Sequence, residues 1–175
     1  DTIRYGNIKL KNYKKVYSDE DVIQFSVVTL VLPDGSLVLS FSGTDGSITG
    51  WKENLMMTYK PDLPCQKLAK DYVKETIENI PETSYLFGLK KKKVYPKIYL
   101  TGHSKCGNLA MYAFLKNPEL QRYIEGVKSF DGPGFLESFW QGDEDISKIT
   151  NYIPKDSIVG RVLHHREQTK IMDAE

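Results

Sequence analysis

The sequence predicts an α/β fold built on a mostly parallel central sheet with helices on both faces. Runs of apolar and β-branched residues alternate along the chain with segments in which apolar residues recur at helical spacing. Strands that alternate with crossover helices form parallel or mixed sheets, because each helix carries the chain back across the sheet. Sites in such sheets lie beyond the carboxyl ends of the strands, so polar residues there are the first candidates for function.

Composition limits the class of protein. The 175 residues suit one domain, and we expect residues 1–175 to form a single domain that is incomplete at its C-terminal end. The 24 basic and 23 acidic residues leave a net charge of +1, which gives no electrostatic case for nucleic acid. No apolar run approaches the roughly 18 residues that cross a bilayer, so no transmembrane segment is expected. The two cysteines form no disulfide framework and suit a reducing cytoplasm.

The N-terminal half opens with a predicted β-hairpin. Residues 23–32 and 37–41 are rich in β-branched and aromatic side chains, and the Pro-Asp-Gly-Ser turn at 33–36 joins them. Residues 51–59 are expected to form a short helix or a loop. Residues 64–80 carry apolar side chains at helical spacing and are followed by a proline, which predicts a helix that ends there.

The C-terminal half contains the remaining predicted elements. The lysine run at 90–93 is expected to be a solvated loop before a strand. That strand ends near Gly102, and a helix over about 106–115 follows it. Residues 127–130 and 158–163 are also expected to be strands, the first of them buried.

The most informative segment is the strand–turn–helix pattern around Gly102-His103-Ser104-Lys105-Cys106. This order is typical of a nucleophile elbow, in which a sharp turn lifts a serine hydroxyl above the sheet. The N-terminus of the following helix then faces the anionic intermediate. The usual spacing is Gly-x-Ser-x-Gly, and Cys106 departs from it. We interpret Ser104 as the candidate nucleophile, with an ordinary helix N-cap as the alternative.

A serine nucleophile requires a histidine base that a carboxylate orients. His103 is adjacent to Ser104, and neighbouring side chains on a tight turn diverge, so we interpret His103 as a packing residue. His164 and His165 follow the acidic candidates, which fits a chain order of nucleophile, acid and histidine. A polar strand end is the alternative interpretation of these two histidines.

The remaining site residues are predicted from their positions at strand and helix ends. The acid is either Asp131, directly after a predicted strand, or Asp156, which is also a plausible turn former. An oxyanion hole needs two N–H donors, which the Lys105 backbone and the segment around Thr44 would supply. Cys106 follows Lys105 in the first helical turn, where a thiol pKa is often lowered, although we expect Cys106 to be buried and inert.

Five motifs together point to a family. They are Phe-Ser-Gly-Thr-Asp at 41–45, Gly-Trp-Lys-Glu-Asn at 50–54, Gly-His-Ser-Lys-Cys-Gly-Asn-Leu-Ala at 102–110, Asp-Gly-Pro-Gly-Phe at 131–135 and Ser-Ile-Val-Gly at 157–160. In this order they resemble the bacterial, uncharacterised lipase-like α/β-hydrolases with a Gly-His-Ser-Lys-Gly-Gly-Asn elbow, which are related to class 3, fungal-type lipases. The resemblance implies an α/β-hydrolase-like three-layer sandwich with Ser104 as nucleophile and Thr44 near the oxyanion hole.

The chain departs from that family in several places. Cys106 stands at the first elbow glycine, Ser42 where arginine is usual, and Asn54 where aspartate is usual. The family also carries a His-Asp segment some way past the Ser-Ile-Val-Gly motif, and no such segment occurs up to Glu175. The general base is therefore either His165 or a residue beyond Glu175, and we favour the second.

The leading hypothesis is a serine hydrolase that cleaves a carboxylic ester or lipid-like substrate through an acyl-enzyme at Ser104. It needs no cofactor and no metal. The alternative is a catalytically impaired scaffold with a binding role, motivated by Cys106 and by the uncertain histidine. A thiol hydrolase that uses Cys106 is a third hypothesis. Acyl length and oligomeric state do not follow from the sequence.

Overall fold

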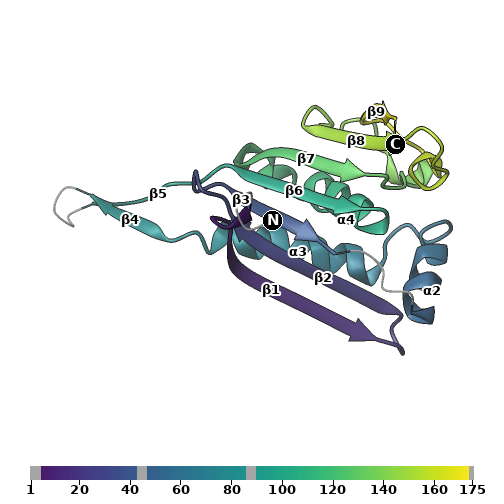
Figure 1. Cartoon of the computed structure of the whole chain (residues 1–175), viewed down its shortest axis with the longest axis horizontal. Helices are drawn as coiled ribbons and strands as arrows, with labels where there is room; N and C mark the ends of the chain where they lie inside the picture. Colours follow the sequence, from purple (N-terminus) through teal and green to yellow (C-terminus); the bar gives the residue numbers. More distant parts are fainter. Residues whose placement is uncertain (1–4, 43–46, 86–89, 174–175) are drawn as a thin grey trace.

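The computed structural model describes residues 5–42, 47–85 and 90–173. A seven-stranded sheet runs through the molecule in the order β1-β2-β3-β6-β7-β8-β9 (Figure 1). Its strands are β1 (Lys9–Ser18), β2 (Ile23–Val31), β3 (Leu37–Phe41), β6 (Ile98–His103), β7 (Ile124–Phe130), β8 (Ile149–Pro154) and β9 (Gln168–Met172). The five adjacent strands β3, β6, β7, β8 and β9 are parallel to one another, and β2 and β1 extend the sheet in antiparallel fashion beyond β3.

Among the described residues, three α-helices and three short 3₁₀ helices connect the strands. The α-helices are α2 (Ile48–Met56), α3 (Pro64–Glu78) and α4 (Lys105–Leu115), and the 3₁₀ helices are η1 (Pro118–Tyr123), η2 (Glu137–Phe139) and η3 (Val159–Arg161). A separate two-stranded ribbon, β4 (Glu82–Tyr85) and β5 (Lys90–Lys93), projects from one end of the molecule (Figure 1). The expected α/β-hydrolase-like fold, with a mostly parallel central sheet flanked by helices, is confirmed.

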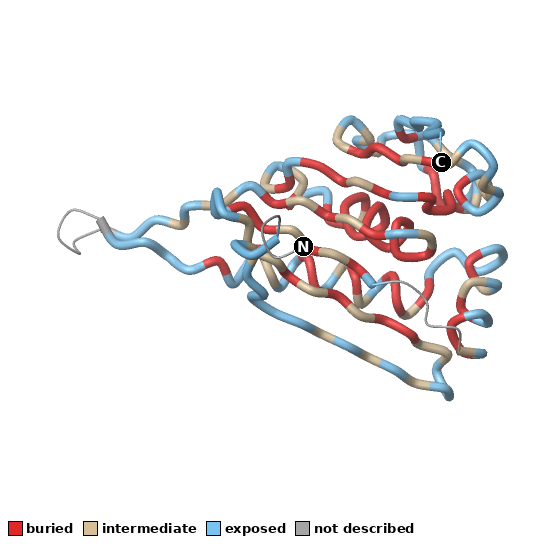
Figure 2. Tube along the Cα trace, viewed as in Figure 1, coloured by how far each residue is buried: buried red, intermediate tan, exposed pale blue. Residues whose placement is uncertain are grey.

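The core lies between the sheet and the helices α3 and α4, which pack side by side on one face (Figures 1 and 2). Along β6, Ile98 and Leu100 are fully buried under α4, whereas the alternating Tyr99 and Thr101 are half-buried on the opposite face. Every residue of α4 is buried, so this helix is enclosed on all sides. An enclosed helix on central parallel strands gives the residues at its N-terminus a rigid foundation.

The predicted hairpin of β2 and β3 is confirmed, and its turn follows the expected chemistry. Gly35 adopts φ +83°, and its N–H donates to the Leu32 carbonyl oxygen at 2.9 Å. The Asp34 carboxylate accepts a hydrogen bond from the Ser36 N–H at 3.0 Å and so closes the turn. The helix predicted over 64–80 is also present, as α3.

The prediction of a strand over 158–163 is wrong. This segment contains η3 and ends in Leu163 at φ +70°, a left-handed conformation that no strand accommodates. Its apolar residues form a loop over the carboxyl end of the sheet and do not add a strand to the sheet. In the lysine run at 90–93, Lys91 and Lys92 are exposed and Lys93 is half-buried, and the run forms β5 instead of the expected loop.

Three strands of the main sheet lack the expected apolar signature. β9 is exposed at all five positions and β1 at most of its ten, because both are edge strands. Charged side chains on edge strands discourage pairing with other chains. Strands of this kind therefore show no clear hydrophobic pattern in the sequence. β8 is buried, but Thr150 and Asn151 interrupt its apolar run.

Burial predicts how two leucines respond to the same truncation. Leu100 on β6 is 0% exposed, whereas Leu10 on β1 is 65% exposed. Leu100→Ala is expected to lower the free energy of unfolding by about 2–5 kcal/mol through lost burial and the remaining cavity. Leu10→Ala should change it by less than about 0.5 kcal/mol. Urea denaturation measures both, and similar losses would contradict this placement of the core.

Candidate active site

Ser104 occupies a sharp turn between β6 and α4. It adopts φ +55° and ψ −131°, a conformation that is strained for a residue with a side chain. Its N–H donates to the Phe130 carbonyl oxygen at 2.8 Å, which ties the turn to the end of β7. A Cβ atom on Gly102 would overlap the carbonyl oxygen of Cys106, so only glycine fits there. The predicted strand–turn–helix arrangement is therefore present; residues 102–105 are called the Ser104 turn below.

Gly107, one residue after the usual spacing, provides the close approach of α4 to its neighbours. A Cβ atom on Gly107 would overlap the Ser129 hydroxyl and lie 3.0 Å from the Gly132 Cα atom. The Cys106 side chain instead points toward the end of β3, where its thiol donates to the Ser42 carbonyl oxygen at 2.6 Å. Cys106 stands at the first elbow glycine of the resembled family, but the close approach that requires glycine occurs at Gly107.

The Cys106 thiol is buried and protonated at neutral pH. Burial raises its pKa to about 12, and the nearby positive charge of Lys105 only partly opposes this shift. The lowered pKa that a reactive cysteine needs is therefore absent. Cys65, the other cysteine, is also free and buried, and burial raises its pKa well above the usual value.

The Lys105 side chain is buried beneath the Ser104 turn, which the sequence analysis did not foresee. Its ammonium group donates to a Glu53 carboxylate oxygen at 2.5 Å and to the Gln24 carbonyl oxygen at 3.0 Å. Both charged side chains are almost completely removed from water. As the first residue of α4, Lys105 also leaves its backbone N–H outside the helical hydrogen-bond ladder.

Of the two acidic candidates, the structure holds Asp131 in place. Asp131 follows β7 at φ +55° and is 8% exposed. One carboxylate oxygen accepts a hydrogen bond from the Ser157 hydroxyl at 2.7 Å, and the other accepts from the Gly160 N–H at 3.0 Å. Asp156 is exposed, and within the described part of the chain its carboxylate has no hydrogen bond.

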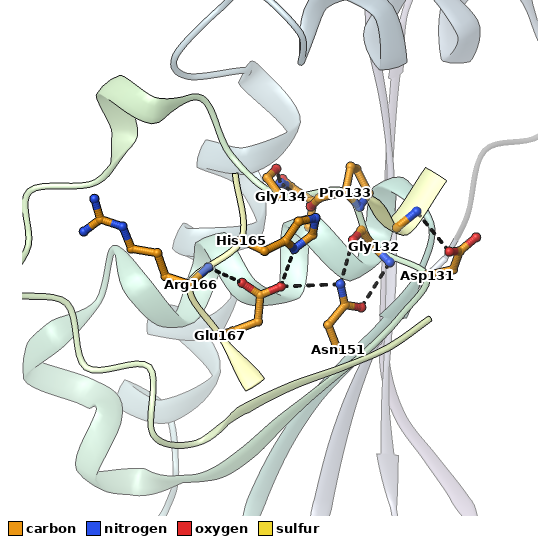
Figure 3. A network of polar contacts seen from close by, with 10 residues as sticks. Asp131, Gly132, Pro133, Gly134, Asn151, His165, Arg166 and Glu167 are labelled. Carbon is orange, nitrogen blue, oxygen red and sulfur yellow. Dashed lines mark hydrogen bonds and ion pairs between the residues drawn. The ribbon is translucent and has the colours of Figure 1, made fainter. Parts of the chain in front are cut away.

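His165 pairs with a carboxylate that the sequence analysis did not consider. Its Nδ1 atom lies 2.6 Å from a carboxylate oxygen of Glu167, which is also 3.4 Å from the amide nitrogen of Asn151 (Figure 3). Asn151 in turn donates to the Gly132 carbonyl oxygen at 2.8 Å. Burial alone would raise the pKa of Glu167, but the hydrogen bond and charge of His165, with backbone N–H donors, together lower it.

Neither C-terminal histidine is bonded to Ser104. Among the residues that the structure describes, no hydrogen bond joins the Ser104 hydroxyl to another group. His164 is exposed, and its backbone bridges to Phe135. The structure therefore places His165 with Glu167 and not with the candidate nucleophile. Thr44, the expected second oxyanion residue, lies outside the described residues.

Ser104 opens into a cavity of about 330 Å³ between α2 and the loop that contains η3. Its lining is mostly apolar and consists of Trp51, Asn54, Leu55, Met57, Thr58, Ser104, Lys105, Pro133, Val159, Val162 and Leu163. Among the described lining residues, Lys105 is the one that carries a charge, and its ammonium group is bound to Glu53 in the interior. The cavity therefore suits an uncharged, apolar group next to the Ser104 hydroxyl.

A second hollow, of about 320 Å³, lies at the carboxyl ends of β6 to β9. Its lining includes His103, Phe130, Asp131, Tyr152, Pro154 and Met172. Asp131 thus borders a space large enough for another side chain. In the described part of the chain, no three His, Cys, Asp or Glu side chains group so as to hold a metal ion. None of the described helices has the length and apolar character needed to cross a membrane.

Comparisons with known proteins place the chain in a family and agree with its fold. The model of the Mbeg1-like family matches residues 1–175, so the chain belongs to the Mbeg1-like family. The structure is similar to a lipase from Rhizopus microsporus var. chinensis, with a TM-score of 0.66 and 14% identity over 99% of this chain. The chain spans 64% of the length of that lipase. M37 lipase matches with a TM-score of 0.49 and 18% identity, over 84% of this chain and 54% of its own. No curated protein matches the chain by sequence.

The raised pKa of Cys106 predicts a pH dependence of stability. Above about pH 9 the thiol ionises in the unfolded chain but stays protonated in the folded protein up to about pH 12. The folded state then binds more protons than the unfolded state, so stability falls as pH rises. The free energy of unfolding of the wild type, relative to Cys106→Ala, should decrease by about 2 kcal/mol between pH 7.5 and 10.5. Urea denaturation under reducing conditions measures this, and a constant difference would contradict the burial of the thiol.

Proposed function

We propose that this member of the Mbeg1-like family is a serine hydrolase that cleaves carboxylic esters through an acyl-enzyme at Ser104. One observation carries the proposal: Ser104 sits in a strained turn at the N-terminus of α4 and opens into an apolar cavity. A helix N-cap without a role in catalysis has no need of a positive φ. The strain is explained if the turn serves to present the hydroxyl to a substrate.

The chemistry follows from the groups around Ser104. The Ser104 oxygen would attack the ester carbonyl carbon while its proton passes to a base, and the carbonyl oxygen would become an oxyanion. The Lys105 N–H at the start of α4 is free to donate to that oxyanion, and the segment around Thr44 would supply the second donor. Expulsion of the alcohol would leave the acyl-enzyme, which water would hydrolyse to the acid and free Ser104.

Asp131 is the better candidate for the triad acid. The ends of β6 and β7 are joined by the hydrogen bond from Ser104 to Phe130, and Asp131 is the next residue after Phe130. Its carboxylate is held by Ser157 and Gly160, and the residue lines the second hollow. Asp156 lies on the same loop as Ser157 but is exposed to solvent. No described residue makes a hydrogen bond that would orient its carboxylate toward a histidine.

The proposed base lies outside the described residues. The hollow beside Asp131 is the space in which an imidazole could donate a hydrogen bond to the Asp131 carboxylate, and His103, the residue before Ser104, also lines it. Met172, the last residue of β9, lines this hollow, so the chain leaves the sheet next to it. A histidine from the His-Asp segment of the resembled family would fit this place. In this view His165 braces the loop and takes no part in proton transfer.

The cavity indicates the class of substrate. The described lining is mostly apolar, and Glu53 neutralises the charge of Lys105 within it. Such a lining favours uncharged acyl groups, including those of lipid-like esters, over acyl groups that carry a carboxylate. The likeness to lipases, at 14% identity, supports the fold and leaves the substrate to experiment. The two free, buried cysteines fit the cytoplasmic location that we propose.

The nucleophile can be tested directly with the full-length protein. A fluorophosphonate probe should label one site, identified by mass spectrometry as Ser104, because the turn and the Lys105 N–H favour a tetrahedral adduct there. Ser104→Ala should abolish labelling and reduce hydrolysis of p-nitrophenyl butyrate to background. Cys106→Ala, the matched control, should retain both activities because its thiol is buried and protonated.

If residues 1–175 are assayed alone, added imidazole supplies the proton acceptor. Absence of both labelling and turnover in the full-length wild type would refute the hydrolase and favour a binding scaffold.

The two aspartates offer a matched pair of substitutions. Asp131→Asn is expected to lower kcat by about 10³–10⁴-fold, because a neutral amide neither stabilises an imidazolium nor fixes the tautomer of the base. Asp156→Asn should leave kcat within about twofold, since its carboxylate is exposed and has no described partner. Steady-state kinetics with p-nitrophenyl butyrate measures both. The reverse order of effects would assign the acid to Asp156.

A further inference from the structure

The buried Lys105–Glu53 ion pair joins three segments that are far apart in the sequence. The ammonium group of Lys105, at the start of α4, contacts the Glu53 carboxylate on α2 and the Gln24 carbonyl on β2. The second oxygen of Glu53 lies 3.5 Å from the Gln24 backbone nitrogen. The pair therefore fixes α2 and the first strand of the hairpin against the Ser104 turn.

Helix α2 has few apolar contacts that could replace this link. Its buried residues are Thr49, Gly50 and Glu53, none of which carries a large apolar side chain. Of its large apolar residues, Ile48, Trp51 and Leu55 are 75%, 66% and 65% exposed, and Met56 at its C-terminal end is partly buried against the core. A nine-residue helix has little stability of its own in water, so its position depends on what it contacts. For α2 the deepest of those contacts is the carboxylate of Glu53.

The same helix forms one wall of the cavity at Ser104. Trp51 and Leu55 line it, and they lie on the same α2 helix as Glu53. The other end of the ion pair is the side chain of Lys105, whose backbone N–H is the proposed oxyanion donor. One carboxylate thus holds both the wall that would contact the acyl group and the residue that would stabilise the oxyanion.

We propose that Glu53 is a positioning residue. Through its ion pair with Lys105, it holds the acyl-binding wall of α2 and the oxyanion-donating N–H of Lys105 in place beside Ser104. This inference rests on the proposed hydrolase function for its kinetic part. Its structural part, that the pair holds α2 in place, does not depend on any activity.

Glu53→Gln tests the proposal with the smallest change, because it keeps the shape of the side chain and removes its charge. Amide hydrogen exchange over residues 48–56 should become at least about tenfold faster, while exchange in α3 should change less. In kinetics, kcat for p-nitrophenyl acetate should fall at least about tenfold because the N–H donor is displaced. The preference for hexanoate over acetate in kcat/KM should also fall at least about fourfold. This factor corresponds to the loss of the apolar contact that one methylene group of the acyl chain makes with α2.

Two controls separate positioning from general loss of stability. Ile77→Ala truncates a fully buried residue on α3 and should lower the melting temperature without changing the acyl preference. Glu75→Gln removes a carboxylate from an exposed pair with Lys14, 3.8 Å apart, and should change nothing measurable. A general loss of stability would give Ile77→Ala the same altered preference as Glu53→Gln.

A second variant covers the case in which the lone buried ammonium prevents folding. Glu53→Gln combined with Lys105→Met removes both charges, so no unpaired charge is buried, while the Lys105 backbone position is kept. It should fold, yet show the same fast exchange in α2 and the same loss of acyl preference. Wild-type exchange and preference in this double variant would overturn the proposal.

The outcomes also distinguish this proposal from the hydrolase itself. If wild-type Ser104 is neither labelled nor active, the proposed function fails, and the exchange of α2 alone decides whether Glu53 holds it. If the wild type is active and Glu53→Gln retains its kcat, its acyl preference and its protection from exchange, the function stands and the positioning role is refuted.

Discussion

The arrangement of the site depends on one interaction, the ion pair between Lys105 and Glu53 in the interior. Removing two charges from water is costly, and the attraction between them repays that cost only in good geometry with further hydrogen bonds. Here the ammonium gains a second acceptor in the Gln24 carbonyl. The net contribution of such a pair to stability is small, but loss of either partner leaves a buried charge uncompensated. The pair therefore acts mainly to select a single position for α2, which has little apolar surface in the core.

Adjacent parallel strands bring the nucleophile and acid candidates together at one edge of the sheet. Ser104 and Asp131 both adopt φ +55° directly after neighbouring strands. Each strained residue costs about 1–3 kcal/mol, so the surroundings must hold it in place. The Phe130 carbonyl holds Ser104, and Ser157 with Gly160 holds the Asp131 carboxylate. Strain at two adjacent strand ends, each fixed by specific bonds, is more consistent with a prepared site than with two unrelated turns.

The elements that could be predicted are those whose sequence signals lie within one short segment. The hairpin, α3 and the Ser104 turn were predictable because turn residues, helical spacing and the strand–turn–helix order all lie within short segments. Edge strands β1 and β9 were not predictable, since exposed residues carry no apolar pattern. The burial of the Lys105 side chain and the pairing of His165 with Glu167 depend on segments that meet only in the folded chain. For the burial of Lys105, the one available signal was the acidic residue Glu53 in the motif at 50–54, within a segment predicted to be a short helix or a loop.

The His165–Glu167 pair shows why residue types alone do not identify a catalytic base. It has the carboxylate–imidazole contact of a triad, and the pKa of Glu167 is lowered, so the carboxylate stays charged beside the imidazole. Yet its further contacts run through Asn151 to Gly132 (Figure 3), next to Asp131, and not to Ser104. The pair thus supports the turn that carries Asp131. In the proposed hydrolase, the sheet edge presents the candidate nucleophile and acid, and the base would come from a separate segment in the hollow beside Asp131. In such a division, the proton acceptor could be supplied or withheld without disturbing the two groups that the sheet fixes.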